Sequence, residues 1–324
     1  MYNWNEIRNR INEFIDNLKF EREPYGLYEP IRYTISQGGK RVRPVLFLMA
    51  YNMYKENLDE AFYPALALET YHNHTLIHDD VMDNADLRRG MPTVRAKWND
   101  TAAILSGDSM LLLAYEFLSH VPADKLPVML ATFTEMAKEI CDGQQYDLGF
   151  ETREDVTEAE YLNMIRLKTS VLLATSLRLG AYLAGASEED QENLYAYGEK
   201  MGLAFQLQDD LLDVYADESL FGKKIGGDIC CNKKTFLLIT AMNLASPVQL
   251  AEMKEWMAKS EFDAAEKVAC FTRIYDELGV RDICEKRIQA LFDECDQYMA
   301  NLSVAPEKKK FLKEFADSLL NRNL

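Results

Sequence analysis

The same acidic phrase occurs twice in this chain, and both copies lie within apolar sequence. The first copy is DDVMD at residues 79–83, and the second is DDLLD at residues 209–213. On a helix the outer aspartates of each copy project from one face, separated by about 40° of rotation. Burying such carboxylates at the edge of a core is costly unless cations neutralise them. The pattern therefore predicts helices that present paired carboxylates to a cation, although a solvated acidic face explains either copy taken alone equally well.

The composition favours helices over strands. Proline and glycine are scarce, at 9 and 15 of 324 residues, whereas the strong helix formers Leu, Ala, Glu, Lys and Met are abundant. The length is sufficient for a sizeable core. We therefore predict an all-α fold in one large domain that spans residues 1–324.

The charge balance excludes several classes of partner. With 53 acidic and 36 basic residues, the formal net charge is −17. Nucleic acids and anionic membranes attract basic surfaces, so neither is an expected partner. No apolar run reaches the ~18 residues that a membrane span needs, and the first residues lack the apolar core of a signal peptide. We expect a soluble, cytoplasmic protein without a transmembrane segment.

Helical periodicity and capping patterns locate the main elements. Residues 2–20 carry apolar side chains at three- and four-residue spacing, and we expect residues 61–85 to form one helix that bears the first acidic cluster. A further helix is expected from Ala131. The sequence Thr157-Glu158-Ala159-Glu160 is a capping box that begins a long helix ending near Gly185. Ser246-Pro247 has the cap and first-turn proline of another helix start.

Basic residues lie close to the acidic clusters along the chain. Two glycines at residues 38–39 allow a turn in which Lys40, Arg41 and Arg43 converge on an anion, although a solvated basic loop is the alternative. Arg88 and Arg89 follow the first cluster, and guanidinium groups bind phosphate oxygens through paired hydrogen bonds. An acidic cluster followed by basic residues suggests a site that binds a metal ion together with a phosphate.

A stretch rich in glycine and lysine, residues 216–235, follows the second acidic cluster. We predict that it is a loop between helices. It contributes four lysines near that cluster, at positions 223, 224, 233 and 234.

In its ordered set of motifs, the chain resembles the trans-isoprenyl diphosphate synthases, the head-to-tail polyprenyl synthetases, over nearly its whole length. The pieces that carry the resemblance are GGKRVRP at 38–44, the run from Glu69 to Asp80, DDVMD with Arg88-Arg89-Gly90, Gly107-Asp108, GQQYD at 143–147, Lys168-Thr169, FQLQDDLLD at 205–213, Lys223, Gly227-Asp228 and Lys233.

The resemblance implies a single helical bundle around a deep central cavity, with the two acidic clusters facing each other at its mouth, and a homodimer. It implies Mg²⁺-dependent condensation of isopentenyl diphosphate with an allylic diphosphate, either dimethylallyl, geranyl or farnesyl diphosphate. The product would be a short trans-prenyl diphosphate, farnesyl or geranylgeranyl diphosphate, and diphosphate would be released. A synthase of longer chains is the alternative within the family.

The resemblance also assigns roles to individual residues. The expected metal ligands are Asp79, Asp83 and Asp209. The expected supports of the metal site are Asp80, Asp213 and Asp228. The expected contacts of the leaving diphosphate are Arg88, Lys168, Lys223 and Lys233. The expected contacts of isopentenyl diphosphate are Lys40, Arg43, His72 and Arg89. Thr169 and Gln206 are expected beside the reacting carbons.

Product length in this family depends on residues just before the first aspartate. A large aromatic residue at the fifth position before it implies a short product, and a small residue implies a long one. Here the fifth position is His74 and the fourth is Thr75. We expect these two residues to form the floor that limits the growing hydrocarbon.

Three other functions compete with this assignment. A class I terpene cyclase would share the first acidic cluster, but its second metal motif normally has an Asn/Asp-Ser/Thr-Glu pattern. A metal phosphohydrolase of the HD type needs histidines spread along the chain, whereas all four histidines here lie between residues 72 and 120. A non-catalytic partner subunit of a prenyl synthase would typically have lost aspartates that this chain retains, and turnover by the isolated protein would exclude it.

Overall fold

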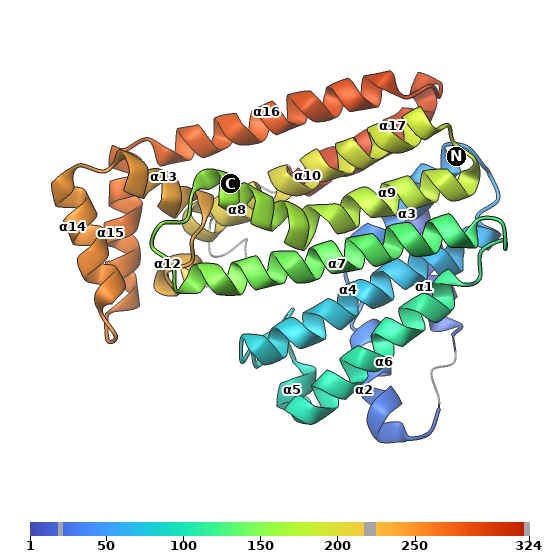
Figure 1. Ribbon diagram of the computed structural model, residues 1–324, viewed down its shortest axis with the longest axis horizontal. Helices are drawn as coiled ribbons and strands as arrows, with labels where there is room; N and C mark the ends of the chain where they lie inside the picture. The colour runs from blue at the N-terminus through green and yellow to red at the C-terminus, as the bar shows by residue number, and fades with distance from the viewer. Residues whose placement is uncertain (19–21, 217–224, 321–324) are drawn as a thin grey trace. The chain divides into compact units, whose positions relative to one another are not determined.

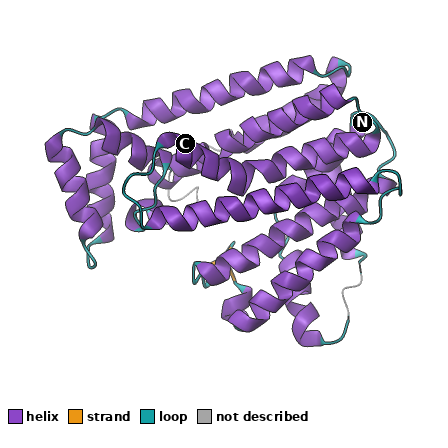
Figure 2. Ribbon diagram, viewed as in Figure 1, coloured by secondary structure: helices purple, strands orange, loops and turns teal. Residues whose placement is uncertain are grey.

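The computed structural model describes residues 1–18, 22–216 and 225–320, and the regular secondary structure of these residues is almost entirely helical (Figure 2). Within that part of the chain the strands are β1 (Leu87–Arg88) and β2 (Met91–Pro92), a short antiparallel pair. The prediction of an all-α fold is confirmed.

The described residues group into two compact units. The first unit comprises Met1–Glu135, Thr175–Leu194 and Leu302–Lys313, and the second comprises the rest of the described chain.

The first unit contains the amino-terminal helices. They are α1 (Trp4–Asp16), α2 (Tyr25–Ser36), α3 (Val42–Asn52), η1 (Asp59–Ala61), α4 (Phe62–Met82), α5 (Val94–Lys97) and α6 (Asp100–Leu118), together with parts of α7 (Leu126–Glu151), α9 (Val171–Ala184), α10 (Glu188–Tyr215) and α17 (Pro306–Leu320). The stripe expected in residues 2–20 forms α1, which begins at a capping box between Asn3 and Glu6 and buries Ile7, Ile11 and Ile15.

Helix α4 is the central element of the first unit. Its residues from Pro64 to Tyr71 are all buried, as expected of a helix that is packed on every side. It packs mainly along α6 and also against α3 (Figure 1). The helix ends at Met82, so the first acidic cluster lies at its carboxyl end, immediately before the β1–β2 hairpin.

The second unit contains most of the carboxyl-terminal helices. They are α8 (Glu158–Ile165), the π-helical segment η2 (Arg166–Ser170), α12 (Gly227–Cys230), α13 (Phe236–Leu244), α14 (Pro247–Ala258), α15 (Ala264–Glu277) and α16 (Val280–Asn301), with the remaining parts of α7, α9, α10 and α17. The predicted capping box begins α8, and the predicted Ser246-Pro247 start begins α14.

The π-helical segment is held between two glycines. A Cβ atom on Gly143 of α7 would lie 2.4 Å from the backbone nitrogen of Lys168, and one on Gly202 of α10 would lie 2.7 Å from the Cα of Ser170. Because no other residue permits such close approaches, these glycines fix the backbone of Lys168 and Thr169 within the second unit. A π-helical turn of this kind is frequent at functional sites.

Three predicted boundaries differ from the structure. The helix expected from Ala131 begins at Leu126, because a proline at position 127 is accommodated in a first helical turn. The single helix expected from Thr157 to Gly185 contains the π-helical segment, because the glycines on both sides allow its widened turn. The loop expected over residues 216–235 contains the short helix α12, which the side chain of Asp213 caps through the Asp228 amide, 3.0 Å away.

Helix α6 is the one helix in the described ranges that is long and apolar enough to cross a membrane, judged by length and composition. This differs from the expectation that no segment would meet that criterion. In the first unit α6 packs against α4, α2 and α5, and core helices of soluble proteins meet the same criterion.

Candidate active site

The first acidic cluster divides into one buried and two more accessible carboxylates. Asp80 is only 4% exposed and accepts a hydrogen bond of 2.7 Å from Nε of Arg88. Burial raises the pKa of Asp80, and the Arg88 guanidinium partly offsets that rise. Asp79 is half-buried and Asp83 is exposed at the end of α4. Asp80 therefore anchors Arg88, whereas the outer carboxylates of Asp79 and Asp83 are more accessible to solvent.

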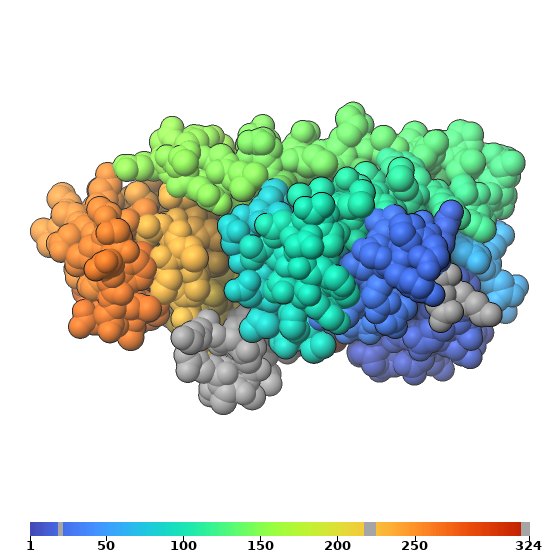
Figure 3. All heavy atoms as spheres, turned by 90° about the horizontal axis from the view of Figure 1, so that it is seen from below, coloured from blue at the N-terminus to red at the C-terminus, as the bar shows by residue number. Residues whose placement is uncertain are grey.

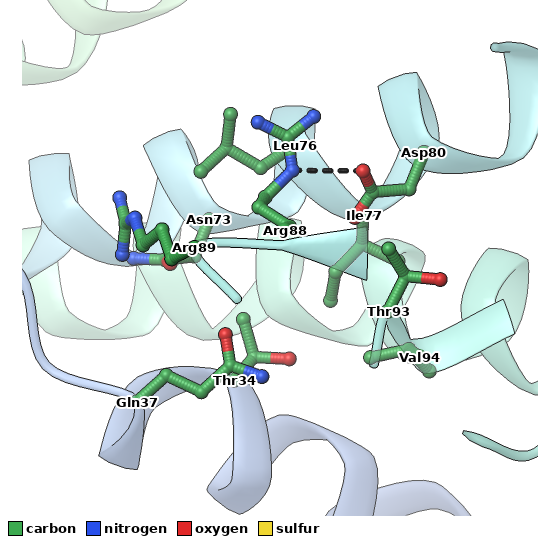
Figure 4. A pocket seen from close by; sticks show the side chains of 10 residues that line it. All are labelled: Thr34, Gln37, Asn73, Leu76, Ile77, Asp80, Arg88, Arg89, Thr93 and Val94. Carbon is green, nitrogen blue, oxygen red and sulfur yellow. Dashed lines mark hydrogen bonds and ion pairs between the residues drawn. The ribbon is translucent and has the colours of Figure 1, made fainter. Parts of the chain in front are cut away.

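A narrow pocket lies beside this cluster, between α2, α4 and the β1–β2 hairpin (Figure 4). Its lining consists of Thr34, Gln37, Asn73, Leu76, Ile77, Asp80, Arg88, Arg89, Thr93 and Val94. Figure 4 shows Arg88 directed toward Asp80, and Arg89 among the other side chains that line the pocket. Nη1 of Arg89 donates to the carbonyl oxygen of Gly38, 3.0 Å away, which links the hairpin to the glycine turn.

Several cationic side chains interact around His72 in the first unit. Burial lowers the pKa of His72 well below its usual value, and the charges of Arg43 and Arg89 lower it further. Burial also lowers the pKa of Arg43 to about 10, with Glu69 opposing and Arg89 adding to the shift. His72 is therefore neutral near pH 7. Cations that raise one another's energy in this way create a local positive potential, which favours binding of an anion in an otherwise acidic protein.

Arg41 does not join this cluster as an anion contact, contrary to the expectation that Lys40, Arg41 and Arg43 converge. Its buried guanidinium pairs with Glu69 at 2.9 Å and donates to the carbonyl oxygen of Ile35 at 2.6 Å. Its left-handed backbone, with φ of 50°, precedes α3 and accompanies this inward orientation. Lys40 is exposed next to the glycine turn.

The two expected chain-length residues have different environments. Nδ1 of His74 lies 2.9 Å from the carbonyl oxygen of Gly107 on α6, and its ring centroid lies 4.6 Å from that of His78. Burial lowers the pKa of His74 to about 4, with His78 contributing. Thr75 donates its hydroxyl to the carbonyl oxygen of His72 on its own helix, 2.8 Å away. His74 is thus fixed between α4 and α6, whereas the Thr75 hydroxyl is satisfied locally.

The second acidic cluster lies on α10 in the second unit, and its middle carboxylate is the most buried. Asp210 accepts hydrogen bonds from the hydroxyl of Tyr161 and from Nε2 of Gln206, the latter at 3.4 Å. Burial raises its pKa to about 7, Lys233 lowers it, and Asp228 raises it. Neither Tyr161 nor Asp210 was among the predicted site residues. The apolar neighbours of Asp210 in the sequence were the available indication of its burial.

The supporting residues of the second cluster are connected to one another. Asp213 accepts from the backbone amide of Asp228 at 3.0 Å, and burial raises the pKa of Asp213, with the charge of Asp228 adding to the shift. Nζ of Lys233 lies 3.8 Å from Oδ1 of Asp228. Asp209 is half-buried on the same helix. Lys223 lies outside the described residues.

The π-helical segment brings the predicted Lys168 and Thr169 to this unit. Nζ of Lys168 donates to Oδ2 of Asp147 at 2.6 Å, and the Thr169 hydroxyl donates to Oε1 of Gln206 at 3.4 Å. Because Gln206 also contacts Asp210, a continuous chain of hydrogen bonds connects Thr169 to the second acidic cluster.

The donor set is suited to a hard cation that shares its coordination with phosphate. Among the described residues, no three His, Cys, Asp or Glu side chains are arranged as a ready-made metal cage. Mg²⁺ normally uses one or two carboxylates, several waters and a substrate phosphate, so it needs no such cage. Burial raises the pKa values of Asp80, Asp210 and Asp213, and the charge of Asp228 adds to the rise for Asp210 and Asp213. A cation bound nearby would stabilise the charged forms of these carboxylates.

The comparison with protein families decides the identity of the chain. The family model of the polyprenyl synthetases matches residues 24–275. This chain belongs to the polyprenyl synthetase family. As a member, it is a prenyltransferase that makes short-chain trans-prenyl diphosphates, and this confirms the function predicted from the motifs.

Similar polyprenyl synthetases match along nearly the full length of the chain. A geranylgeranyl diphosphate synthase of Methanosarcina mazei is 38% identical, over 98% of this chain and 97% of its own. A crystal structure of a geranylgeranyl pyrophosphate synthase has 41% identity and a TM-score of 0.94, with 100% of both chains covered. A geranylgeranyl pyrophosphate synthase of Corynebacterium glutamicum, complexed with isoprenyl diphosphate and magnesium, has 27% identity and a TM-score of 0.86, covering 99% of this chain and 98% of its own. These names favour the synthase over a cyclase or an HD-type phosphohydrolase.

Proposed function

We propose that this polyprenyl synthetase condenses isopentenyl diphosphate with allylic diphosphates in the presence of Mg²⁺, with geranylgeranyl diphosphate as its main product. The cationic cluster around the neutral His72 is the observation that carries this proposal. It is suited to an anion that binds without a metal, whereas the two acidic clusters are suited to a metal-bound diphosphate. The reaction needs both kinds of site.

Isopentenyl diphosphate binds through its diphosphate at Lys40, Arg43, His72 and Arg89. Arginine forms paired hydrogen bonds with phosphate oxygens, and the neutral imidazole of His72 donates one further hydrogen bond without adding charge. The turn at residues 38–39, which Arg89 contacts through the Gly38 carbonyl, supports this arrangement.

The allylic diphosphate departs as an anion, so its leaving group needs stabilisation. Asp79 and Asp83 would hold Mg²⁺ in the first unit, and Asp209 would hold Mg²⁺ in the second unit. When bound, Mg²⁺ neutralises charge that develops on the leaving diphosphate. The side chains that bind the same diphosphate directly are Arg88, Lys168, Lys223 and Lys233. Asp80, Asp213 and Asp228 orient these groups, as their contacts with Arg88, the α12 amide and Lys233 support.

The carbon chemistry needs little help from titrating side chains. The C–O bond of the allylic diphosphate breaks, the terminal carbon of isopentenyl diphosphate attacks the allylic carbon, and the resulting cation loses a proton to the released diphosphate. The oxygens of Thr169 and Gln206 offer dipoles to the cation. Their hydrogen bond, extended to the buried Asp210, holds these dipoles in place.

Product length is limited by His74, with Thr75 beside it. The bond to the Gly107 carbonyl and the contact with His78 hold the imidazole in a fixed position. The imidazole is of intermediate size and is held in place, so it would block a hydrocarbon longer than the geranylgeranyl chain. A mobile side chain would move aside and allow a longer product.

The protein works as a soluble, cytoplasmic homodimer without a transmembrane segment. The outward face of α6 carries the exposed Ile104, Leu105 and Leu112, and Figure 3 shows this helix open to solvent beside α2. An exposed apolar stripe on a helix that packs against α4 supports an interface with a second copy better than a membrane span. Leu112→Glu is expected to give monomers in analytical ultracentrifugation. A variant that stays dimeric would exclude this face as the interface.

The activity is tested by incubating purified protein with Mg²⁺, labelled isopentenyl diphosphate and each allylic starter in turn. The dephosphorylated products are then separated by length. A discrete C20 alcohol that disappears on chelation is the expected result. Cyclised hydrocarbon, simple hydrolysis or untouched starter would instead support the cyclase, phosphohydrolase or partner-subunit functions, respectively.

The metal-free pocket is tested with a matched pair of arginine variants. Arg43→Gln should raise KM for isopentenyl diphosphate roughly tenfold or more, the loss expected for one charge-assisted bond. Arg32→Gln is the control, because Arg32 forms an exposed pair with Glu29 and is not among the residues that line the pocket. Equal KM values in both variants would contradict the assignment of this pocket.

A further inference from the structure

Lys267 on α15 is a charged side chain that is completely buried within the second unit. Its relative exposure is 0%, and in the part of the chain that the structure describes it has no carboxylate within ion-pair distance. Its Nζ donates to Oδ1 of Asn232 at 2.7 Å and to the carbonyl oxygen of Cys230 at 3.2 Å, and it lies 4.3 Å from the ring centroid of Phe262. Burying an ammonium among neutral acceptors is costly, so its contribution to folding alone does not account for it.

The acceptors of Lys267 belong to the turn that precedes Lys233. Asn232 has φ of 53°, in the left-handed region, and its Nδ2 donates to the carbonyl oxygen of Met257 at 3.0 Å. Its side chain is therefore held from two directions. Its backbone has a left-handed conformation that asparagine adopts more readily than most residues with a Cβ atom. The next residue, Lys233, donates its amide to the carbonyl oxygen of Asp228 at 2.9 Å. The turn at Asn232 thus sets where the Lys233 side chain begins.

Helix α15 supports the other end of α12 as well, through the residue next to Lys267. A Cβ atom on Gly226 would lie 2.3 Å from Cγ2 of Val268, so α15 packs directly against the start of α12, and the two helices are in contact (Figure 1). The amide of Gly226 donates to the backbone oxygen of Asp213 at 2.6 Å. Lys267 and Val268 therefore hold both ends of a segment that is attached to the second acidic cluster.

We infer that Lys267 is a positioning residue for the prenyl transfer. It holds the turn at Asn232 in place, so that the Lys233 side chain reaches the leaving diphosphate. This inference rests on the proposed role of Lys233. A lysine side chain is long and flexible, and its reach depends on where its backbone is anchored. Small displacements of a charged contact have large effects on rate, because the contact acts when charge develops on the leaving group.

The test compares Lys267→Met with Asn232→Gly, and each with Lys233→Ala, alone and combined. Methionine fills the same space without the ammonium, and glycine keeps the left-handed turn without the side chain. Both variants should lower kcat about 10- to 100-fold, the loss usual for supports of a metal site, and leave KM for isopentenyl diphosphate unchanged. The midpoint of Lys267→Met in urea unfolding should stay at or above that of the unmodified protein, because a buried charge is replaced by an apolar group. Asn232→Gly removes one acceptor of the buried Lys267 ammonium, so its midpoint should fall, and its kcat is measured under conditions in which it is fully folded. Lys200→Met, which removes an ion pair with Glu294, is the control with unchanged kcat.

The double variants separate positioning from general structure. In a Lys233→Ala background, Lys267→Met should cause no further loss of kcat, and Asn232→Gly should behave in the same way. A full additional loss, or wild-type kcat in Lys267→Met and Asn232→Gly, would overturn the inference. If Lys267→Met does not fold, the comparison of Asn232→Gly with and without Lys233→Ala tests the inference in the same way. Wild-type kcat in Lys233→Ala itself would refute the proposed role of Lys233 and, with it, this inference.

Discussion

Replacing Arg41 with methionine should destabilise the first unit far more than replacing an exposed arginine. Arg41 and Glu69 form an ion pair of 2.9 Å in which the two side chains are 3% and 4% exposed. Arg41 also donates to the carbonyl oxygen of Ile35, and Oε2 of Glu69 has no hydrogen-bond partner within the described part of the chain. Arg41→Met therefore leaves a buried carboxylate without its direct counter-ion.

The expected cost follows from the burial of the pair. Removing one partner of a buried ion pair typically costs about 3–5 kcal/mol. Arg43 lies close enough to Glu69 for their charges to interact, so we expect the lower end, about 3 kcal/mol. The exposed pair of Arg32 and Glu29, with side chains 51% and 40% exposed, provides the control. Arg32→Met should cost less than about 1 kcal/mol.

Urea unfolding, followed by circular dichroism, measures both free energies. The double variant Arg41→Met/Glu69→Met should recover most of the stability lost in Arg41→Met, because the isolated charge is then removed as well. Equal losses in Arg41→Met and Arg32→Met would refute the reasoning. A double variant that is less stable than Arg41→Met would show that the loss comes from packing instead of charge.

Further predictions concern the acidic clusters and the product floor. Asp79→Ala or Asp209→Ala should lower kcat roughly a hundredfold or more with an unchanged circular dichroism spectrum, and near-normal turnover in either would refute its assignment as a metal ligand. His74→Ala should lengthen the prenyl alcohols separated by chromatography, and unchanged products would place the floor elsewhere. The pKa of His74 is lowered from 6.5 to about 4, so below pH 6.5 the unfolded chain binds more protons at this residue and folding stability falls as the pH drops toward 4. His74→Phe should remove that share of the loss between pH 7 and pH 5 in urea unfolding, and identical losses in both proteins would show that His74 titrates normally.

Local patterns in the sequence predicted local structure well. The capping box at Thr157 and Glu160 begins α8, and Ser246 with the following proline begins α14. Such caps act between residues three positions apart, so the sequence contains the whole interaction. The amphipathic pattern of α1 was equally visible, because its buried face repeats at helical spacing.

Long-range contacts account for what the sequence did not reveal. Arg41 and Arg43 are near neighbours of the same charge, yet Arg41 turns inward to Glu69, which is 28 positions away. The π-helical segment depends on glycines contributed by two other helices. The burial of Asp210 beneath Tyr161 likewise depends on a contact across 49 positions. A pattern within a single stretch of sequence does not predict contacts between residues that lie far apart in the chain.

The same distinction between local patterns and long-range contacts applies to the candidate site. The motifs named Arg43, His72 and Arg89 as contacts of one substrate, and the structure brings the charges of the two arginines close enough to lower the pKa of His72. That His72 is held neutral could not be predicted, because this depends on burial and on the arrangement of the surrounding arginines in space. The motifs supplied the residue types, and the fold determines their charge states.

The neutrality of His72 has a consequence for a cell whose internal acidity changes. Guanidinium groups supply the positive charge, and even the lowered pKa of Arg43, about 10, lies far above neutrality. The imidazole remains uncharged because its pKa is well below its usual value. Mild acidification therefore leaves the charge of this pocket constant, and its attraction for a substrate varies with ionic strength instead. The affinity of this pocket for isopentenyl diphosphate should therefore respond to added salt more than to mild changes in the charge of its own side chains.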